Sequence, residues 1–201
     1  MVMVNPLPSP TDADTLKFVE HDMPDASAPT QAAWRLLVVD DEPDVHHVTT
    51  FALNRVTILG RPLEFLHAYS AAQAAEILQR EQDIAVVLLD VVMEHEHAGL
   101  ELVKVIRQEL KLTELRIILR TGQAGYAPEI EAIHDYDIND YKTKSELTRT
   151  KLFASVTSAI RAFEQIRALN ALAFYDQLTG LANRNRFIDL IDGHLRQDTV
   201  G

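Results

Sequence analysis

The chain has 201 residues and a formal net charge of −11, with 30 Asp and Glu against 19 Lys and Arg. This acidic balance excludes a non-specific nucleic-acid binder, whose phosphate contacts need clustered basic side chains. The lack of cysteine excludes disulfides and thiolate metal sites. No apolar stretch approaches the length of a membrane-spanning helix, and the N-terminus lacks the basic region that opens a signal peptide. We therefore expect a cytoplasmic protein without nucleic-acid or membrane partners.

Residues 1–33 are expected to form a mobile N-terminal arm. Five prolines are spread among Asp, Ser, Thr and Ala, at Pro6, Pro8, Pro10, Pro24 and Pro29. Such a composition buries too little apolar surface to offset the entropy lost when the chain becomes ordered.

Apolar strands alternate with amphipathic helices from Trp34 onward. Five segments are expected as strands: 35–39, 63–67, 84–89, 115–119 and 138–141. Four segments between them have helical periodicity: 44–58, 70–81, 99–111 and 127–134. The alternation predicts an α/β domain at 34–150, built on a doubly wound, five-stranded parallel sheet.

Two of the apolar segments end in carboxylates. Residues 84–89 are uninterrupted and apolar, which is typical of a strand buried on both faces, and Asp90 follows them. Asp40 and Asp41 follow the first strand in the same way. Because carboxyl ends of parallel strands share one edge of a sheet, we expect the three acids to meet there. Oxygen-only ligands favour Mg²⁺, and an aspartate beside such an ion can attack phosphorus.

In chain order, the strand ends at this edge carry an acid pair, an acid, a hydroxyl and a lysine. These are Asp40, Asp41, Asp90, Thr121 and Lys144. This order resembles the receiver domain of two-component response regulators, over residues 34–150. The resemblance implies a flavodoxin-like fold, a regulatory domain rather than an enzyme, and a sensor histidine kinase as phosphoryl donor.

The resemblance also implies a role for each acid. Asp90 would be the phosphoacceptor. Asp41 would bind Mg²⁺ directly and Asp40 would bind it through water. Asp90 itself and the backbone carbonyl of Val92 would be the remaining protein ligands.

Two lysines compete for the last position. Lys142 and Lys144 share a face of the last strand, because alternate residues point the same way. Receivers carry an aromatic switch residue three positions before their lysine, and Tyr141 has that spacing from Lys144, which favours Lys144. Lys144 and the hydroxyl of Thr121 would bind phosphoryl oxygens, and Tyr141 would rotate from exposed to buried.

Two departures from the receiver pattern affect loops beside this site. Ser145 stands where receivers usually have a proline joined by a cis bond, so we expect a trans bond here. The loop at 93–99 lacks the usual proline after its methionine and is one residue longer. Both loops border the expected site, so the surface that responds to phosphorylation would differ from the family pattern.

Four histidines near the expected acid site leave a second metal chemistry open. They are His46, His47, His95 and His97. Imidazole suits transition metals, but a solvated polar loop is the simpler interpretation, because spacing alone does not show that ligands converge. Imidazolium charge here would also make phosphorylation depend on pH between about 6 and 7.

Two alternative functions remain open at this point. A phosphatase that uses an aspartyl phosphate would place a general acid two residues after its nucleophile, and Val92 cannot donate a proton. A binding-only receiver would act through protein contacts alone, although every position of the site is filled here.

A long helix is expected after the sheet, because residues 145–175 contain neither glycine nor proline. Apolar residues and one asparagine recur at alternating spacings of four and three: Leu152, Val156, Ala159, Phe163, Ile166, Asn170 and Ala173. This heptad pattern predicts a signalling helix at 151–175 that pairs with its copy in a homodimer. The alternative is an amphipathic helix that folds back on the sheet.

The residues that follow this helix resemble the start of another domain. Residues 176–184 read Asp-Gln-Leu-Thr-Gly-Leu-Ala-Asn-Arg, similar to the turn that joins a signalling helix to the GGDEF domain of diguanylate cyclases. The resemblance implies a hinge ion pair between Asp176 and Arg184. The Gly-Gly-(Asp/Glu)-Glu-Phe motif is absent, so we expect 176–201 to be a truncated piece of that domain, without cyclase activity. In the parent protein, phosphorylation would align two domains that make cyclic di-GMP.

Overall fold

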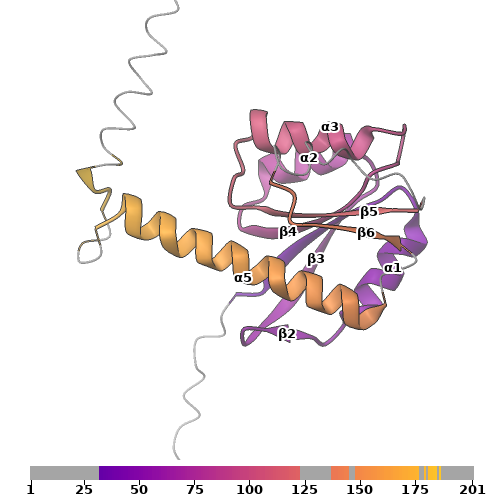
Figure 1. The fold of residues 1–201 in the computed structure, drawn as a ribbon, viewed down its shortest axis with the longest axis horizontal. Coiled ribbons are helices and arrows are strands. Elements are labelled where there is room, and N and C mark those ends of the chain that lie inside the picture. Colours follow the sequence, from indigo (N-terminus) through magenta and orange to yellow (C-terminus); the bar gives the residue numbers. More distant parts are fainter. Residues whose placement is uncertain are drawn as a thin grey trace, which may run out of the picture. The chain divides into compact units, whose positions relative to one another are not determined.

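The computed structural model describes residues 32–122, 137–144, 148–176, 179, 181–184 and 186. In Figure 1 these residues form a sheet with helices on both faces. The predicted N-terminal arm lies outside the described residues except for Ala32 and Ala33. The carbonyl oxygens of these two residues accept hydrogen bonds from the guanidinium of Arg61.

The sheet has six strands in the order β2-β3-β1-β4-β5-β6. Its parallel strands are β1 (Trp34–Val39), β3 (Arg61–Ala68), β4 (Ile84–Asp90), β5 (Arg116–Thr121) and β6 (Asp140–Thr143). Each of them overlaps one of the five predicted strands, so the doubly wound parallel sheet is confirmed. Every residue of β4 is buried, as its uninterrupted apolar run predicted.

The sixth strand corrects the prediction of one helix over 44–58. Helix α1 covers only Pro43–Ala52, and β2 (Thr57–Ile58) pairs antiparallel with the start of β3. Leu59 and Gly60 form a two-residue hairpin loop with φ values of 50° and 77°. Positive φ at both loop positions matches the twist of the flanking strands, and the β-branched residues before the loop favour a strand.

The helices after β3 lie where the periodicity predicted them. Helix α2 (Ala71–Arg80) begins at Ser70, whose side chain accepts a hydrogen bond from the backbone N–H of Gln73. Helix α3 (Ala98–Lys104) continues into the π-helical turn η1 (Val105–Glu109). The helix predicted at 127–134 lies outside the described residues. Among the described helices, none combines the length and the apolar character needed to cross a membrane.

An apolar cluster fills the space on each side of the sheet. One cluster lies between the strands and α2, α3 and η1. The other lies between the strands, α1 and α5 (Arg149–Phe174), which cover the opposite face in Figure 1. The sheet is therefore buried on both faces, and its chemistry is restricted to its edges.

Helix α5 confirms the predicted long helix, but the first half of its predicted dimer seam is buried inside this chain. The side chains concerned are Leu152, Val156, Ala159 and Phe163. Phe163 meets Trp34 of β1 edge-on, with ring centroids 6.3 Å apart. The prediction that this half pairs with a copy is wrong, because the sheet already covers it. The alternative, a helix that folds back on the sheet, holds here.

The second half of α5 extends past the sheet in Figure 1 and is held by two polar contacts. Arg167 Nη1 lies 3.0 Å from Asp83 Oδ1, before β4. Asn170 Nδ2 donates a hydrogen bond of 2.6 Å to Glu114 Oε1, before β5. The polar residue of the predicted heptad is thus bonded within its own chain.

We expect Phe163→Ala to lower the free energy of unfolding by about 3–5 kcal/mol, because it leaves a cavity between α5 and the sheet. The matched control is Phe153→Ala on the same helix, since Phe153 is 39% exposed and Phe163 only 4%. The control should lose less than half as much stability in urea unfolding. Equal losses would show that α5 does not pack against the sheet.

Candidate functional site

Three aspartates converge at the carboxyl edge of the sheet. Asp40 and Asp41 follow β1, and Asp90 ends the neighbouring strand β4. Carboxylate oxygens from all three lie within 4.8 Å of one another. Asp40 and Asp90 are buried and Asp41 is exposed. The structure thus brings the three predicted acids together, with one of them facing solvent.

The ammonium group of Lys144 lies among these acids. Its Nζ is 2.8 Å from Asp90 Oδ2, 3.2 Å from Asp40 Oδ2 and 3.0 Å from Glu42 Oε1. The competing Lys142 pairs with an aspartate of its own strand at 3.1 Å. Of the two lysines, Lys144 is therefore the one that contacts the acids, as its spacing from Tyr141 favoured. Glu42, to which the sequence analysis assigned no role, joins the site at its exposed side.

Burial and neighbouring charges together shift the pKa values of Asp90 and Lys144. Burial raises the pKa of Asp90, because the charged carboxylate loses its hydration; Lys144 opposes this rise and Asp40 adds to it. Burial also disfavours the charge of Lys144, but hydrogen bonds with Asp90 and Glu42 outweigh it and raise the pKa of the lysine. Lys144 therefore stays charged, and Asp90 is a carboxylate that a further cation would stabilise.

The donor set fits a hard divalent cation. Asp40 Oδ2 is buried and has no hydrogen-bond partner in the part of the chain that the structure describes. Among the described residues, the three aspartates are the one convergent group of three or more His, Cys, Asp or Glu. Oxygen ligands and an open, solvent-facing side suit Mg²⁺, which keeps several waters. The N–H of Val92 lies 3.4 Å from Asp90 Oδ1, which places this peptide beside the acids.

Thr121 and Tyr141 lie on β5 and β6, the two strands that follow β4 in the sheet. Thr121 ends β5 and is fully buried, and the preceding Arg120 pairs in register with Asp90. Tyr141 lies on β6, is half-buried and packs against the cluster beneath α2 and α3. Its rotation stays a prediction, and the bond before Ser145 lies outside the described residues.

Two residues that sequence reasoning did not assign shape this edge. A Cβ atom at Gly99 would lie 2.1 Å from the carbonyl oxygen of Asp90, so α3 begins directly against the backbone of that residue. Arg120 brings a buried guanidinium to the site, with Nη2 3.5 Å from Asp40 Oδ2. A charged residue directly after the apolar run at 117–119 of β5 was the signal for Arg120, whereas the close approach at Gly99 has no signal in the pattern.

The four histidines form no convergent metal cluster among the described residues. His46 is buried, and its Nε2 donates to the carbonyl oxygen of Asp40 at 2.8 Å. Its Nδ1 lies 2.9 Å from Nδ1 of His67 on β3. His95 instead pairs with Glu101 at 3.6 Å. His46 therefore holds the peptide that carries one of the acids.

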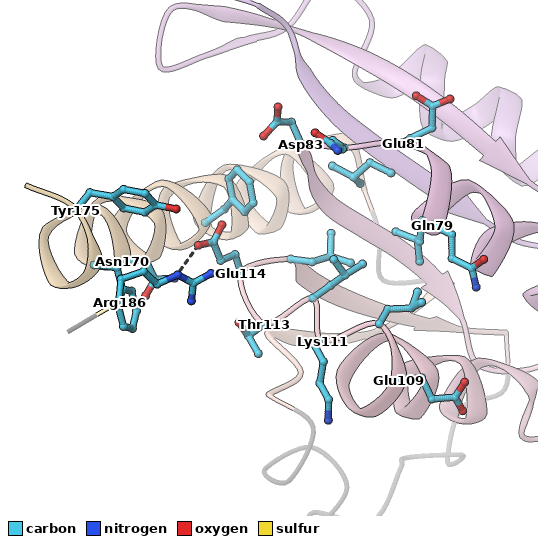
Figure 2. Close-up of a pocket in the computed structure, with 18 residues that line it drawn as sticks. Gln79, Glu81, Asp83, Glu109, Lys111, Thr113, Glu114, Asn170, Tyr175 and Arg186 are labelled. Atoms are coloured by element: carbon cyan, nitrogen blue, oxygen red, sulfur yellow. Dashed lines mark hydrogen bonds between the residues drawn. The ribbon is translucent and has the colours of Figure 1, made fainter. Parts of the chain in front are cut away.

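A groove of about 980 Å³ lies away from this chemistry, between the second half of α5 and the loops that precede β4 and β5. Figure 2 shows the hydrogen bond between Asn170 and Glu114 within it, with Tyr175 and Arg186 nearby. None of the predicted acid, hydroxyl or lysine positions lines this groove. This groove is therefore separate from the acid site.

Of the two predicted hinge residues, Asp176 begins a tight turn after α5, and Arg184 follows that turn. Oδ1 of Asp176 accepts hydrogen bonds from the N–H and the hydroxyl of Thr179, at 2.9 and 2.8 Å. Tyr175 and Ala182 form an antiparallel bridge across this turn. The ion pair between Asp176 and Arg184 stays a prediction.

Comparison with known families agrees with this geometry. The family model described as the response regulator receiver domain matches residues 36–157. A CheY-like receiver domain from Methanospirillum hungatei JF-1 superposes with a TM-score of 0.54 at 22% identity, covering 65% of this chain and 97% of that one. The similarity to this solved structure supports the fold.

Two curated relatives add detail. The chain is 43% identical over 154 residues to the 3′3′-cGAMP-specific phosphodiesterase 2 of Vibrio cholerae serotype O1, covering 77% of this chain and 28% of that protein. It is 34% identical over 110 residues to a chemotaxis protein CheY homolog of Campylobacter jejuni, covering 55% of this chain and 80% of that protein. The chain therefore spans most of the second relative but little more than a quarter of the first.

We expect Asp90→Asn to raise the free energy of unfolding at neutral pH by about 1 kcal/mol, because it removes a buried charge and leaves Lys144 paired. The raised pKa means that the folded wild type holds the Asp90 proton more strongly than the unfolded chain does. The cost of the charge therefore grows as pH rises from about 3.9, the pKa of an unfolded Asp, through the folded pKa.

This stability gain should consequently vanish when urea unfolding is measured below about pH 4, where wild-type Asp90 is itself neutral. The control is Asp44→Asn, at an exposed acid in the first turn of α1, which should change stability by less than about 0.5 kcal/mol at either pH. A loss of stability in Asp90→Asn at neutral pH would contradict the expectation.

Proposed function

Because this chain belongs to the response regulator receiver domain family, we propose that it is a phosphoaspartate switch that accepts a phosphoryl group from a sensor histidine kinase on Asp90. The observation that carries the proposal is the buried carboxylate of Asp90, 2.8 Å from Lys144 and within reach of two further aspartates. A carboxylate held without its full hydration, beside a fixed cation, is suited to attack on phosphorus.

We propose that the transfer uses the side chains of Asp90, Lys144 and Thr121. An oxygen of Asp90 attacks phosphorus, the phosphorus–nitrogen bond to the kinase histidine breaks, and the imidazole leaves with that electron pair. The product is an acyl phosphate on Asp90. The ammonium group of Lys144 pairs with one phosphoryl oxygen, and the hydroxyl of Thr121 donates to another.

Mg²⁺ is the cofactor that we propose for this site. When bound, it neutralises the charge carried by a phosphoryl group during transfer. Its support here is the convergence of three carboxylates, and a buried Oδ2 of Asp40 that has ionic contacts but no hydrogen bond among the described residues. The ligands that we propose are Asp41 directly, Asp40 through water, Asp90 and the backbone carbonyl of Val92.

The response to phosphorylation is proposed to pass through Tyr141. Thr121 and Tyr141 lie on the paired strands β5 and β6, where Thr121 is opposite Thr143. Movement of the Thr121 hydroxyl toward a phosphoryl group would free space beside Tyr141, which is half-buried before phosphorylation. The ring would then turn inward and shift a two-state equilibrium of this edge.

Two other functions have less support. A phosphatase would need a general acid where Val92 stands. A binding-only receiver would not require a lysine that directly follows β6 to reach a buried carboxylate on β4. The arrangement therefore favours the switch.

The output of the switch is proposed to be an enzyme of cyclic dinucleotides in a longer protein. The resemblance of residues 176–184 to the start of a GGDEF domain supports a diguanylate cyclase. The 43% identity to a 3′3′-cGAMP-specific phosphodiesterase supports a hydrolase as the second candidate. In either case the described residues would be the regulatory part.

The signal is proposed to reach that output through a homodimer formed by the second half of α5. Leu169 and Leu172 on this half are 64% and 55% exposed. Their spacing of three places them on neighbouring parts of one helix face. Pairing with a second copy would cover them without removing Phe163 from the core.

We expect the full chain, incubated with acetyl phosphate and Mg²⁺, to gain one phosphoryl group in intact mass spectrometry, and Asp90→Asn to gain none. Asp44→Asn, at a nearby exposed acid, should be labelled like the wild type. Labelling of Asp90→Asn at the wild-type rate, or no labelling of the wild type, would contradict the assignment of Asp90.

We expect light scattering of the concentrated chain to give the mass of a dimer, and of Leu169→Glu/Leu172→Glu to give a monomer, because like charges would meet across the interface. Leu181→Glu is the control, since Leu181 is 69% exposed but lies beyond α5. A monomeric wild type, with and without acetyl phosphate, would argue against the helix as a dimer contact.

A further inference from the structure

The guanidinium of Arg120 is buried at the acid site. Its side chain is 3% exposed, although it lies on β5 among apolar neighbours. Strand alternation directs Arg120 to the face covered by α1 and α5, opposite to the face of Thr121. A buried cation is costly unless it is fully paired, so its contacts indicate its role.

The contacts of Arg120 leave it only partly paired. Nη1 donates to Oγ1 of Thr49 on α1 at 2.9 Å. Nη2 lies 3.5 Å from Asp40 Oδ2, which is an ionic contact rather than a hydrogen bond. Nη2 and Nε have no hydrogen-bond partner among the described residues. Burial lowers the pKa of Arg120, and the charges of Asp40 and Asp90 oppose this.

Arg116 shows that such incomplete pairing is not general in this strand. It lies four residues earlier on β5 and is equally buried. Its Nε donates to the carbonyl oxygen of Glu114 at 2.7 Å, and its Nη1 to Asp137 Oδ2 at 2.8 Å. Arg120, by contrast, faces Asp40 Oδ2, a buried carboxylate oxygen that lacks a hydrogen bond among the described residues and has a second ionic contact at 3.2 Å, with Lys144.

We propose that Arg120 is a resident cation of the site, which shares Asp40 with Mg²⁺ and thereby weakens Mg²⁺ binding. This inference rests on the metal site of the proposed function. Glu42 and the three aspartates face two cations, Lys144 and Arg120, before any metal binds. Arg120 therefore removes one unit of the negative charge that would attract a divalent ion.

The sign of the effect follows from electrostatics. A guanidinium in contact with Asp40 lies near an ion that the same carboxylate holds through water, and the two cations repel each other through a poorly screened interior. Arginine stays protonated, so this repulsion is permanent across the working pH range. The site would be filled only where Mg²⁺ is abundant, and phosphorylation would follow the Mg²⁺ concentration.

The test is titration calorimetry of the full chain with MgCl₂. Arg120→Met removes the charge but keeps the length of the side chain, and should bind Mg²⁺ at least tenfold more tightly than the wild type, or about 1.4 kcal/mol. Arg120→Lys, which keeps the charge, should remain within about threefold of the wild type. Lys142→Met is the matched control, because Lys142 pairs in register with Arg120 but contacts an acid of its own strand.

A second measurement uses the unaltered protein. The Nε–H proton resonance of Arg120 should shift when MgCl₂ is added, while that of Arg116, at the other end of β5, should not. This measurement needs no variant, so it can be made even if Arg120→Met does not fold. Arg120→Gln is a second neutral variant, for which we expect the same gain in Mg²⁺ affinity.

Several outcomes would overturn the inference. Unchanged Mg²⁺ affinity in Arg120→Met, or an equal gain in Lys142→Met, would show that Arg120 does not compete with the metal. If Asp90 is still phosphorylated in that case, the proposed function stands and only this inference fails. If no variant binds Mg²⁺ and Asp90 is not labelled, both fail.

Discussion

The ion pair between Lys144 and the buried carboxylates is the constraint on which this molecule depends. Asp40 follows β1 and Asp90 ends the neighbouring β4, so the two acids repel each other where water is scarce. The lysine directly follows β6, which lies two strands away from β4. Lys144 reaches both acids only if β4, β5 and β6 keep their register. The order of the strands is therefore a condition of the chemistry, and no single element contains the site.

Most of the fold could be predicted because burial on both faces leaves a strong pattern in the strands. The exceptions are places where one pattern has two structural solutions. The segment at 53–58 is compatible with a longer helix, and the pairing of β2 with β3 decides against it. A heptad stripe looks the same whether a copy or the sheet covers it, so the packing of Phe163 could not be read from spacing.

The site was predictable to the extent that it depends on strand ends. The three acids and Thr121 follow directly from where apolar runs stop, and the spacing from Tyr141 separated Lys144 from Lys142. The role of Arg120 was not predictable, because it depends on distances across strands and helices. The local sequence pattern thus predicts which residues lie at the carboxyl edge of the sheet. The tertiary structure determines which of their charged groups contact each other.

The contact at Gly99 has a mechanical consequence for the loop after Asp90. There is no room for even a methyl group between the start of α3 and the Asp90 carbonyl, and the N–H of Gly99 donates to the carbonyl oxygen of Val91 at 3.0 Å. The two backbone segments are therefore in direct contact. There is no flexible side chain between them to absorb a displacement. A shift of the Asp90 peptide by a fraction of an ångström would therefore displace the first turn of α3 together with it, as one rigid unit.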